Sequence, residues 1–222
     1  MDLDKLNLPD DEDTLLKELR KLREDLDAKT LDEYGRLNPF GENITDWHAR
    51  GDKYASEGSV VYDSATLIGD IEMGPDLWIG PFCMIDGSGG LKIGAHCVFS
   101  TGVHVYTHDS VKYALTGGKA GHDRSPVEIG ECTFIGAQSV VTRGVKIGDH
   151  VLVCANATIT EDVPAWSIVG GTPAKVIGRV VPDGDDVRLE YFHGASPEQA
   201  EGQGTDGSSS SSSDDLGNGQ TL

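Results

Sequence analysis

The chain has 222 residues, of which 37% are hydrophobic, and its 18 basic against 37 acidic residues give a formal net charge of −19. This length suits one domain of ordinary size with a small appendage. The negative charge argues against a nucleic-acid-binding protein, because such proteins need clustered Lys and Arg. The sequence has no apolar run long enough to cross a bilayer, and it begins with an acidic segment where a signal peptide is basic and then apolar. We therefore expect a cytoplasmic protein that binds neither nucleic acid nor membranes.

Residues 1–59 are predicted to form a helical region. Leu15, Leu19, Leu22 and Leu26 recur at offsets of four, three and four, which is the apolar stripe of an amphipathic helix over about residues 10–29. Acidic residues at the start of this segment suit the positive end of a helix dipole.

A six-residue repeat of large aliphatic side chains follows and predicts the fold. A six-residue period of this length is typical of a parallel β-helix, in which one coil takes three hexads, or about 18 residues. We expect such a helix over residues 60–180, with a small or β-branched residue four positions after each aliphatic also pointing inward, as at Cys83 and Cys97. The repeat shifts by two residues at Gly89-Gly90 and is interrupted after Val105, and its members are Val61, Leu67, Met73, Ile79, Ile85, Ile93, Phe99, Val105, Ile129, Ile135, Val141, Ile147, Val153, Ile159 and Ala165.

The four cysteines are spaced 14, 35 and 22 residues apart, which matches neither a zinc site nor a CxxC redox pair. We expect them to be reduced thiols.

Residues 181–222 are predicted to be a C-terminal extension. From about residue 194 it contains six consecutive serines and few large apolar side chains, so burial cannot offset the entropy of ordering. We expect a disordered, acidic, Ser-rich tail.

Three segments carry a resemblance to a known family, namely residues 85–109 with the YTHD loop, residues 125–164 with unbroken hexads, and residues 165–178 with VGGTPAKVIG. The chain resembles the hexapeptide-repeat acyltransferases, most closely the branch of maltose and galactoside O-acetyltransferases. The resemblance implies a mostly β fold built on a left-handed parallel β-helix, acetyl-CoA as co-substrate without a metal, and a homotrimer with shared sites.

His108 is the candidate catalytic residue. It lies where the hexad phase is lost and an excursion of about 20 residues begins, and such loops on a rigid scaffold often carry function. A neutral imidazole suits removal of a proton from an attacking hydroxyl near pH 7. His108 also matches the catalytic histidine of the resembling family by position, which implies a general base.

Candidate acceptor-binding residues lie near this loop. Asp86 precedes a glycine-rich turn and has either a sugar-binding role or plain turn chemistry, and His104 is either a wall residue of the coil or part of the site. Asp109 and Arg124 flank the excursion. The set favours a neutral, sugar-like acceptor, because a nucleotide-linked sugar requires clustered cations for its phosphates.

A coenzyme A site is implied further along the coil, where small residues let pantetheine approach the backbone. One position departs from the family, since Glu161 stands where many relatives have Lys. The residues implied are Ala137, Ala155, Thr160, Gly170 and Gly171, with Lys175 and Arg179 for the phosphates.

The function expected is therefore acetyl transfer from acetyl-CoA to a hydroxyl of a sugar-like acceptor. N-acetylation of an amino sugar or a nucleotide-linked sugar is the first alternative. A metalloenzyme similar to the γ-class carbonic anhydrases would need three histidines around zinc, and the spacings among His96, His104, His108 and His122 do not reproduce that family's pattern. A non-catalytic β-helix scaffold is the third alternative.

Overall fold

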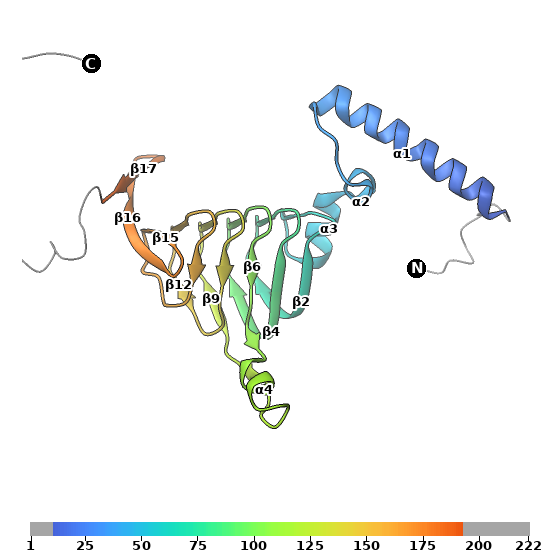
Figure 1. Ribbon diagram of the computed structural model, residues 1–222. Coiled ribbons are helices and arrows are strands. Elements are labelled where there is room, and N and C mark those ends of the chain that lie inside the picture. Colours follow the sequence, from blue (N-terminus) through green and yellow to red (C-terminus); the bar gives the residue numbers. More distant parts are fainter. Residues whose placement is uncertain (1–10, 193–222) are drawn as a thin grey trace, which may run out of the picture. The chain divides into compact units, whose positions relative to one another are not determined.

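The computed structural model describes residues 11–192, and the tail expected from about residue 194 lies outside this range. Figure 1 shows a stack of short parallel strands that forms a β-helix, preceded in the chain by helices. The helices are α1 (Glu12–Tyr34), α2 (Phe40–Ile44), α3 (Trp47–Tyr54) and α4 (Val111–Leu115), and the strands are β1 (Val60–Val61), β2 (Thr66–Met73), β3 (Trp78–Ile79), β4 (Met84–Ile93), β5 (Val98–Phe99), β6 (His104–Val105), β7 (His108–Asp109), β8 (Asp123–Arg124), β9 (Val127–Ile129), β10 (Phe134–Ile135), β11 (Val140–Val141), β12 (Lys146–Ile147), β13 (Leu152–Val153), β14 (Thr158–Ile159), β15 (Ser167–Gly171), β16 (Ala174–Asp183) and β17 (Asp186–Tyr191).

Helix α1 is closed at both ends by its own sequence. The side chain of Asp11 caps the start by accepting hydrogen bonds from the amides of Asp13 and Thr14. Gly35 ends the helix with a φ of 63°, a left-handed conformation that glycine adopts without strain, and its amide donates to the carbonyl of Leu31. The predicted helix is confirmed, and it continues beyond the expected end at residue 29.

Buried Glu42 in α2 ties the helical region to the first coil. Its carboxylate accepts hydrogen bonds from Trp47 Nε1 at 2.9 Å, from the Asp63 amide at 2.9 Å and from the Ser64 amide at 3.0 Å. Helix α3 packs so closely on the coil that a Cβ at Gly51 would lie 1.9 Å from the carbonyl oxygen of Ser59. Glycine at this position is therefore required for the contact.

The coils stack as three parallel faces. Face 1 consists of β1, β3, β5, β10, β13 and β15 in that order. Face 2 consists of the first halves of β2 and β4 followed by β6, β11 and β14, and face 3 consists of the second halves of β2 and β4 followed by β9 and β12. Strands β2 and β4 span two faces with a register shift between Gly69 and Ile71. The two-residue insertion at Gly89-Gly90 lies within β4.

The hexad residues form the core, as the repeat predicts. Ile79, Ile85, Phe99 and Val105 are buried, and so are the small residues expected to point inward, including Cys83 and Cys97. Burial raises the pKa of the Cys97 thiol to about 11, so this side chain is a neutral core residue. All four cysteines are free thiols.

Three hexad positions depart from this pattern. Leu67 and Met73 are only partly buried, because they lie on β2 in the first coils of the stack. Ala165 is exposed, and Val163 takes the inward place two residues earlier, where it pairs with Ile147. The expectation for Ala165 is therefore wrong, since the last coil is two residues shorter than the hexad count assumes.

The stack ends in an antiparallel hairpin. Strand β16 pairs antiparallel with β15 on one side and with β17 on the other, so the expected domain boundary at residue 180 falls inside β16. Hexad counting gives no signal for these strands, because their partner runs in the opposite direction. Among residues 11–192, no helix is both long and apolar enough to span a membrane.

Candidate active site

His108 and Asp86 form a hydrogen-bonded pair at one corner of the β-helix. Asp86 follows the inward-facing Ile85 on face 2, and Ile85 pairs with Val105 of the next coil. This register brings Asp86 beneath the chain that leaves β6, where His108 begins the excursion. The distance from His108 Nδ1 to Asp86 Oδ2 is 2.6 Å, and the side chains are 39% and 2% exposed, respectively.

The Asp86 carboxylate is buried and surrounded by donors. The Ser88 amide donates to it at 3.0 Å and the Thr107 amide at 3.2 Å, and the Ser88 hydroxyl also donates. Burial alone would raise its pKa, but the hydrogen bonds from Ser88, His108 and Thr107 outweigh burial and lower its pKa to about 2. Asp86 is therefore an anion at neutral pH.

The negative charge of Asp86 determines which nitrogen of the His108 imidazole carries the proton. Because the carboxylate only accepts hydrogen bonds, Nδ1 of His108 must carry the proton. In the neutral imidazole this leaves the lone pair on Nε2, and the side chain as a whole is 39% exposed. The arrangement fits a general base that is oriented by a buried carboxylate.

The structure places Asp86 differently from the expected acceptor contact. At 2% exposure, its carboxylate faces His108 and the surrounding amides rather than a cleft. His104, by contrast, points outward on face 2 and is half-buried, with its Nδ1 3.0 Å from the Tyr106 hydroxyl. Arg124 is exposed on β8, directly opposite His108 in the β7–β8 pair.

Arg143 joins the two ends of the excursion. It projects from the corner after β11, and its Nε donates to Asp109, which lies at the start of the loop. At the end of the loop, its Nη2 lies 3.4 Å from Asp123 Oδ2 and its Nη1 3.3 Å from Ser125 Oγ. The Arg143 guanidinium holds the pKa of Asp109 below its usual value. Asp109, an expected acceptor residue, is thus part of the loop anchor.

Substituting Arg143 with alanine is expected to lower kcat/KM for the acceptor about tenfold, because small misplacements of catalytic groups are costly. The loss should appear mainly as a higher KM for the acceptor, with an unchanged melting temperature, since the coil keeps its core. Arg188→Ala on the terminal hairpin is the control. Steady-state kinetics of both variants check this, and equal activities would show that the anchor has no role.

Five of the seven residues implied for coenzyme A lie on or near the two borders of face 2. Ala137, Ala155 and Gly171 stack at the corner between faces 1 and 2, as the pairing of β10, β13 and β15 shows. Thr160 follows β14 at the opposite border. Lys175 is exposed near that border, with its Nζ 3.3 Å from Glu161.

The remaining two of these residues lie elsewhere. Gly170 is buried in β15. Arg179 lies on β16 and pairs with Glu190, with Nη2 2.6 Å from its carboxylate.

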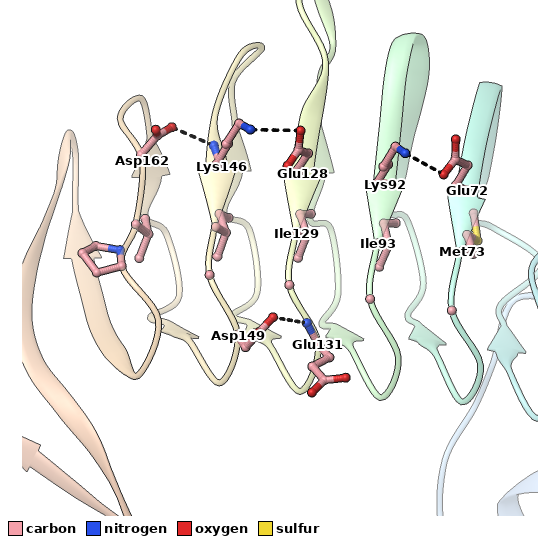
Figure 2. Close-up of a pocket in the computed structure, with 17 residues that line it drawn as sticks. Glu72, Met73, Lys92, Ile93, Glu128, Ile129, Glu131, Lys146, Asp149 and Asp162 are labelled. Atoms are coloured by element: carbon pink, nitrogen blue, oxygen red, sulfur yellow. Dashed lines mark hydrogen bonds and ion pairs between the residues drawn. The ribbon is translucent and has the colours of Figure 1, made fainter.

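A groove lies on face 3, and no histidine is among the residues that line it (Figure 2). Its lining has five carboxylates and two lysines, and Lys92 and Lys146 are paired with Glu72 and Glu128 at 3.0 and 3.1 Å. This excess of negative charge disfavours an anionic ligand, so we place the candidate site at His108 instead. Within residues 11–192, no group of three His, Cys, Asp or Glu side chains is arranged to hold a metal ion.

Part of the repeat matches a known protein family. Residues 126–161 match the family described as bacterial transferase hexapeptide (six repeats). This segment of the β-helix carries hexapeptide repeats. A curated relative, the 2,3,4,5-tetrahydropyridine-2,6-dicarboxylate N-acetyltransferase of Staphylococcus aureus (strain bovine RF122 / ET3-1), is 42% identical over 78 residues. That match covers 35% of this chain and 32% of the relative, so this chain spans about a third of the relative's length.

Solved structures that match this chain include two acetyltransferases and an N-acyltransferase. A maltose O-acetyltransferase from Clostridium difficile 630 is 23% identical with a TM-score of 0.48, and the match covers 78% of this chain and 90% of that one. The acetyltransferase VCA0836 from Vibrio cholerae O1 biovar eltor, complexed with acetyl coenzyme A, is 23% identical with a TM-score of 0.42, covering 73% and 88%. The N-acyltransferase AntD from Bacillus cereus, in complex with dTDP and 3-hydroxybutyryl-CoA, is 21% identical with a TM-score of 0.49, covering 54% and 68%.

Sequence reasoning missed Ser88 and Thr107, which donate to the Asp86 carboxylate, and Arg143, which anchors the loop. Ser88 and Thr107 were detectable in principle. Ile85 and Val105 lie three hexads apart in the series, which is one full coil, so the residues just after each of them lie in adjacent coils at one corner. Arg143 offers no comparable signal, because its partners are defined only by how the loop returns to the coil.

Proposed function

We propose that this chain is an acetyl-CoA-dependent acetyltransferase in which His108 is the general base. The observation that carries the proposal is the His108–Asp86 pair, in which a buried anion holds Nδ1 of a partly exposed imidazole, so that the lone pair lies on Nε2. The hexapeptide repeat over residues 126–161 and the N-acetyltransferase name of the curated relative support the same reaction class.

The reaction follows from the free Nε2. As an acceptor hydroxyl attacks the thioester carbonyl carbon, Nε2 of His108 takes the hydroxyl proton. The tetrahedral intermediate then collapses with cleavage of the C–S bond, and the departing sulfur receives a proton from the imidazolium. The products are an acetyl ester and coenzyme A with a free thiol, and His108 returns to its neutral form. Asp86 stabilises the transient imidazolium.

Face 2 is the surface that we assign to coenzyme A. Its outward side chains Met84, His104, Val140 and Thr158 are in register and half-buried. The small residues Ala137 and Ala155 border it, so an extended pantetheine can approach the backbone there. Lys175 lines one pocket together with Thr160, and its exposed pair with Glu161 is easily exchanged for a phosphate.

The acceptor is proposed to be a neutral, hydroxylated, sugar-like molecule. On the excursion, the cation Lys112 is already paired with Asp123 at 3.0 Å, so it is less suited to meet the phosphates of a nucleotide-linked sugar. N-acetylation of an amino acceptor is the second candidate, because the curated relative is named an N-acetyltransferase. The same base serves both reactions, since each requires a proton to leave the attacking atom.

An acceptor screen with detection of free thiol tests this proposal. The chain is incubated with acetyl-CoA and matched pairs of sugars that carry a hydroxyl or an amino group, both free and nucleotide-linked. We expect His108-dependent thiol release with free hydroxylated sugars. Release only with amino sugars would favour the second candidate, and no release above hydrolysis with any acceptor would contradict acetyl transfer.

A homotrimer is part of the proposal, and face 1 supports association of copies. Its outward row contains Trp78 and Phe134, each 43% exposed. Val98 lies between these two side chains, and Leu152 follows Phe134 in the next coil. A continuous apolar row on a flat face favours contact with another protein surface. Cyclic closure of three copies would bring each excursion against a neighbouring coil.

Replacing Phe134 with glutamate is expected to weaken association at least about 100-fold, because each contact would bury an unpaired charge. Light scattering coupled to size exclusion should show loss of the trimer at micromolar concentration. Leu189→Glu on β17, which also charges an exposed apolar position, should leave the trimer intact. A Phe134→Glu protein that remains trimeric would remove face 1 from the interface.

A further inference from the structure

Helix α1 carries an apolar stripe that remains open to solvent. Leu19 and Leu22 are 42% and 45% exposed, and Leu16 beside them is 41% exposed. The contacts between α1 and α2 lie near the other end of the helix, where Asn43 donates to Asp27 at 3.2 Å. The N-terminal half of α1 thus presents leucines on a well-capped helix of 23 residues.

The spacing of these leucines is that of a coiled coil. Leu15, Leu19, Leu22 and Leu26 are separated by four, three and four residues, which places them at successive d, a, d and a positions of a heptad repeat. Leu16 then falls at an e position and widens the stripe on one side. All four seam positions are leucine, so no polar side chain in the seam disfavours packing of two copies in register.

The charges beside the seam select the orientation of the packed helices. In this heptad frame, Glu18 and Asp25 occupy g positions and Arg23 occupies an e position. In a parallel pair, g meets the e position five residues later on the other helix, so Glu18 faces Arg23 of a second copy. In an antiparallel pair, g positions face each other, and Glu18 would meet Asp25.

Arg23 is free to make this contact. Within its own helix it lies 3.6 Å from Asp27, with 63% of its side chain exposed. A pair that exposed contributes little, so Arg23 can exchange it for Glu18 of a second copy. The seam and its flanking charges are thus self-complementary in the parallel orientation.

We propose that α1 is an oligomerisation segment that packs in parallel and in register against α1 of other copies of this chain. The occupant of the leucine stripe is the same stripe of a second copy. This contact is separate from face 1 and from the His108 site, so it stands or falls independently of the proposed acetyl transfer.

Disulfide trapping in the full-length chain tests the contact. In a parallel, in-register pair, position 15 of one helix lies beside position 15 of the other. We expect Leu15→Cys to form a covalent dimer under mild oxidation at least about tenfold faster than Lys17→Cys, which lies on the opposite side of α1. The wild-type chain, with its own four cysteines, gives the background, and non-reducing electrophoresis is the readout.

A charge swap gives an independent check. In the Leu15→Cys background, Arg23→Glu should slow crosslinking several-fold, and adding Glu18→Arg should restore the rate by recreating the pair in the opposite sense. Equal crosslinking at positions 15 and 17, or failure of the double substitution to recover, would overturn the proposal. Acetyl-transfer activity measured on the same samples keeps this outcome distinct from a failure of the proposed function.

Discussion

His108→Ala is expected to lower kcat for acetyl transfer by two to four orders of magnitude, the usual contribution of one general base. The affinity for coenzyme A should stay near the wild-type value, because the side chain contacts the reacting atoms rather than the carrier. Stopped-time assays of free thiol at saturating acceptor measure the first effect. Calorimetric titration with coenzyme A measures the second.

His96→Ala is the matched control for this substitution. His96 lies at a different corner of the coil, 3.5 Å from Asp76, and its loss should leave kcat unchanged. A His108→Ala protein that retains activity within about threefold of wild type would contradict its role as the base.

Asp86→Asn is expected to lower kcat by about 10²- to 10³-fold, because the amide no longer fixes the proton on Nδ1 of His108. Asn also replaces one acceptor oxygen with an NH₂ donor. Because Ser88 donates to one oxygen of Asp86 and Thr107 to the other, this NH₂ group faces another donor in either orientation of the amide. We therefore regard Asp86 as a positioning residue. Ser88→Ala, which removes one donor and keeps the charge, should lose far less activity, and equal losses in both variants would contradict this assignment.

The same carboxylate predicts a dependence of stability on acid. Its pKa is about 2 in the folded chain against an ordinary value of 3.8, so ionised Asp86 stabilises the fold above pH 4. This stabilisation, about 2 kcal/mol in total, is lost as the pH falls toward 2. Between pH 5 and pH 3 the wild type should lose about 1 kcal/mol more stability than Asp86→Asn. Denaturant unfolding at the two pH values checks this, and parallel losses would show that Asp86 is not an anion in the fold.

The hexad spacing was sufficient to predict the coil, because each aliphatic in the repeat has only the interior to occupy. Ile79, Ile85 and Phe99 illustrate this, since all three are fully buried. The pattern failed at the ends of the stack, where Leu67 has no complete coil above it and Val163 replaces Ala165. The pattern also did not predict β16 and β17, because these strands pair antiparallel and lie outside the hexad repeat.

The candidate site was predicted only in part. His108 could be selected because the loss of phase marks a loop and imidazole suits the chemistry. The role of Asp86 could not be read from its turn-like sequence, since an Asp before Gly is consistent with a simple turn. Its burial and its pairing with His108 depend on the alignment of two coils across the insertion at residues 89–90, which is a property of the stack rather than of either segment.

The excursion that begins at His108 lengthens the loop that must close when neighbouring strands of the β-helix pair during folding. Other neighbouring strands of face 1 lie 16 to 20 residues apart, as with Phe134 and Leu152, but Val98 and Phe134 pair across 36 residues. Doubling a loop adds only about 0.6 kcal/mol of closure entropy. Insertions and deletions between residues 110 and 122 should therefore be nearly neutral for folding, which leaves this segment free to diverge in length as new acceptors are selected.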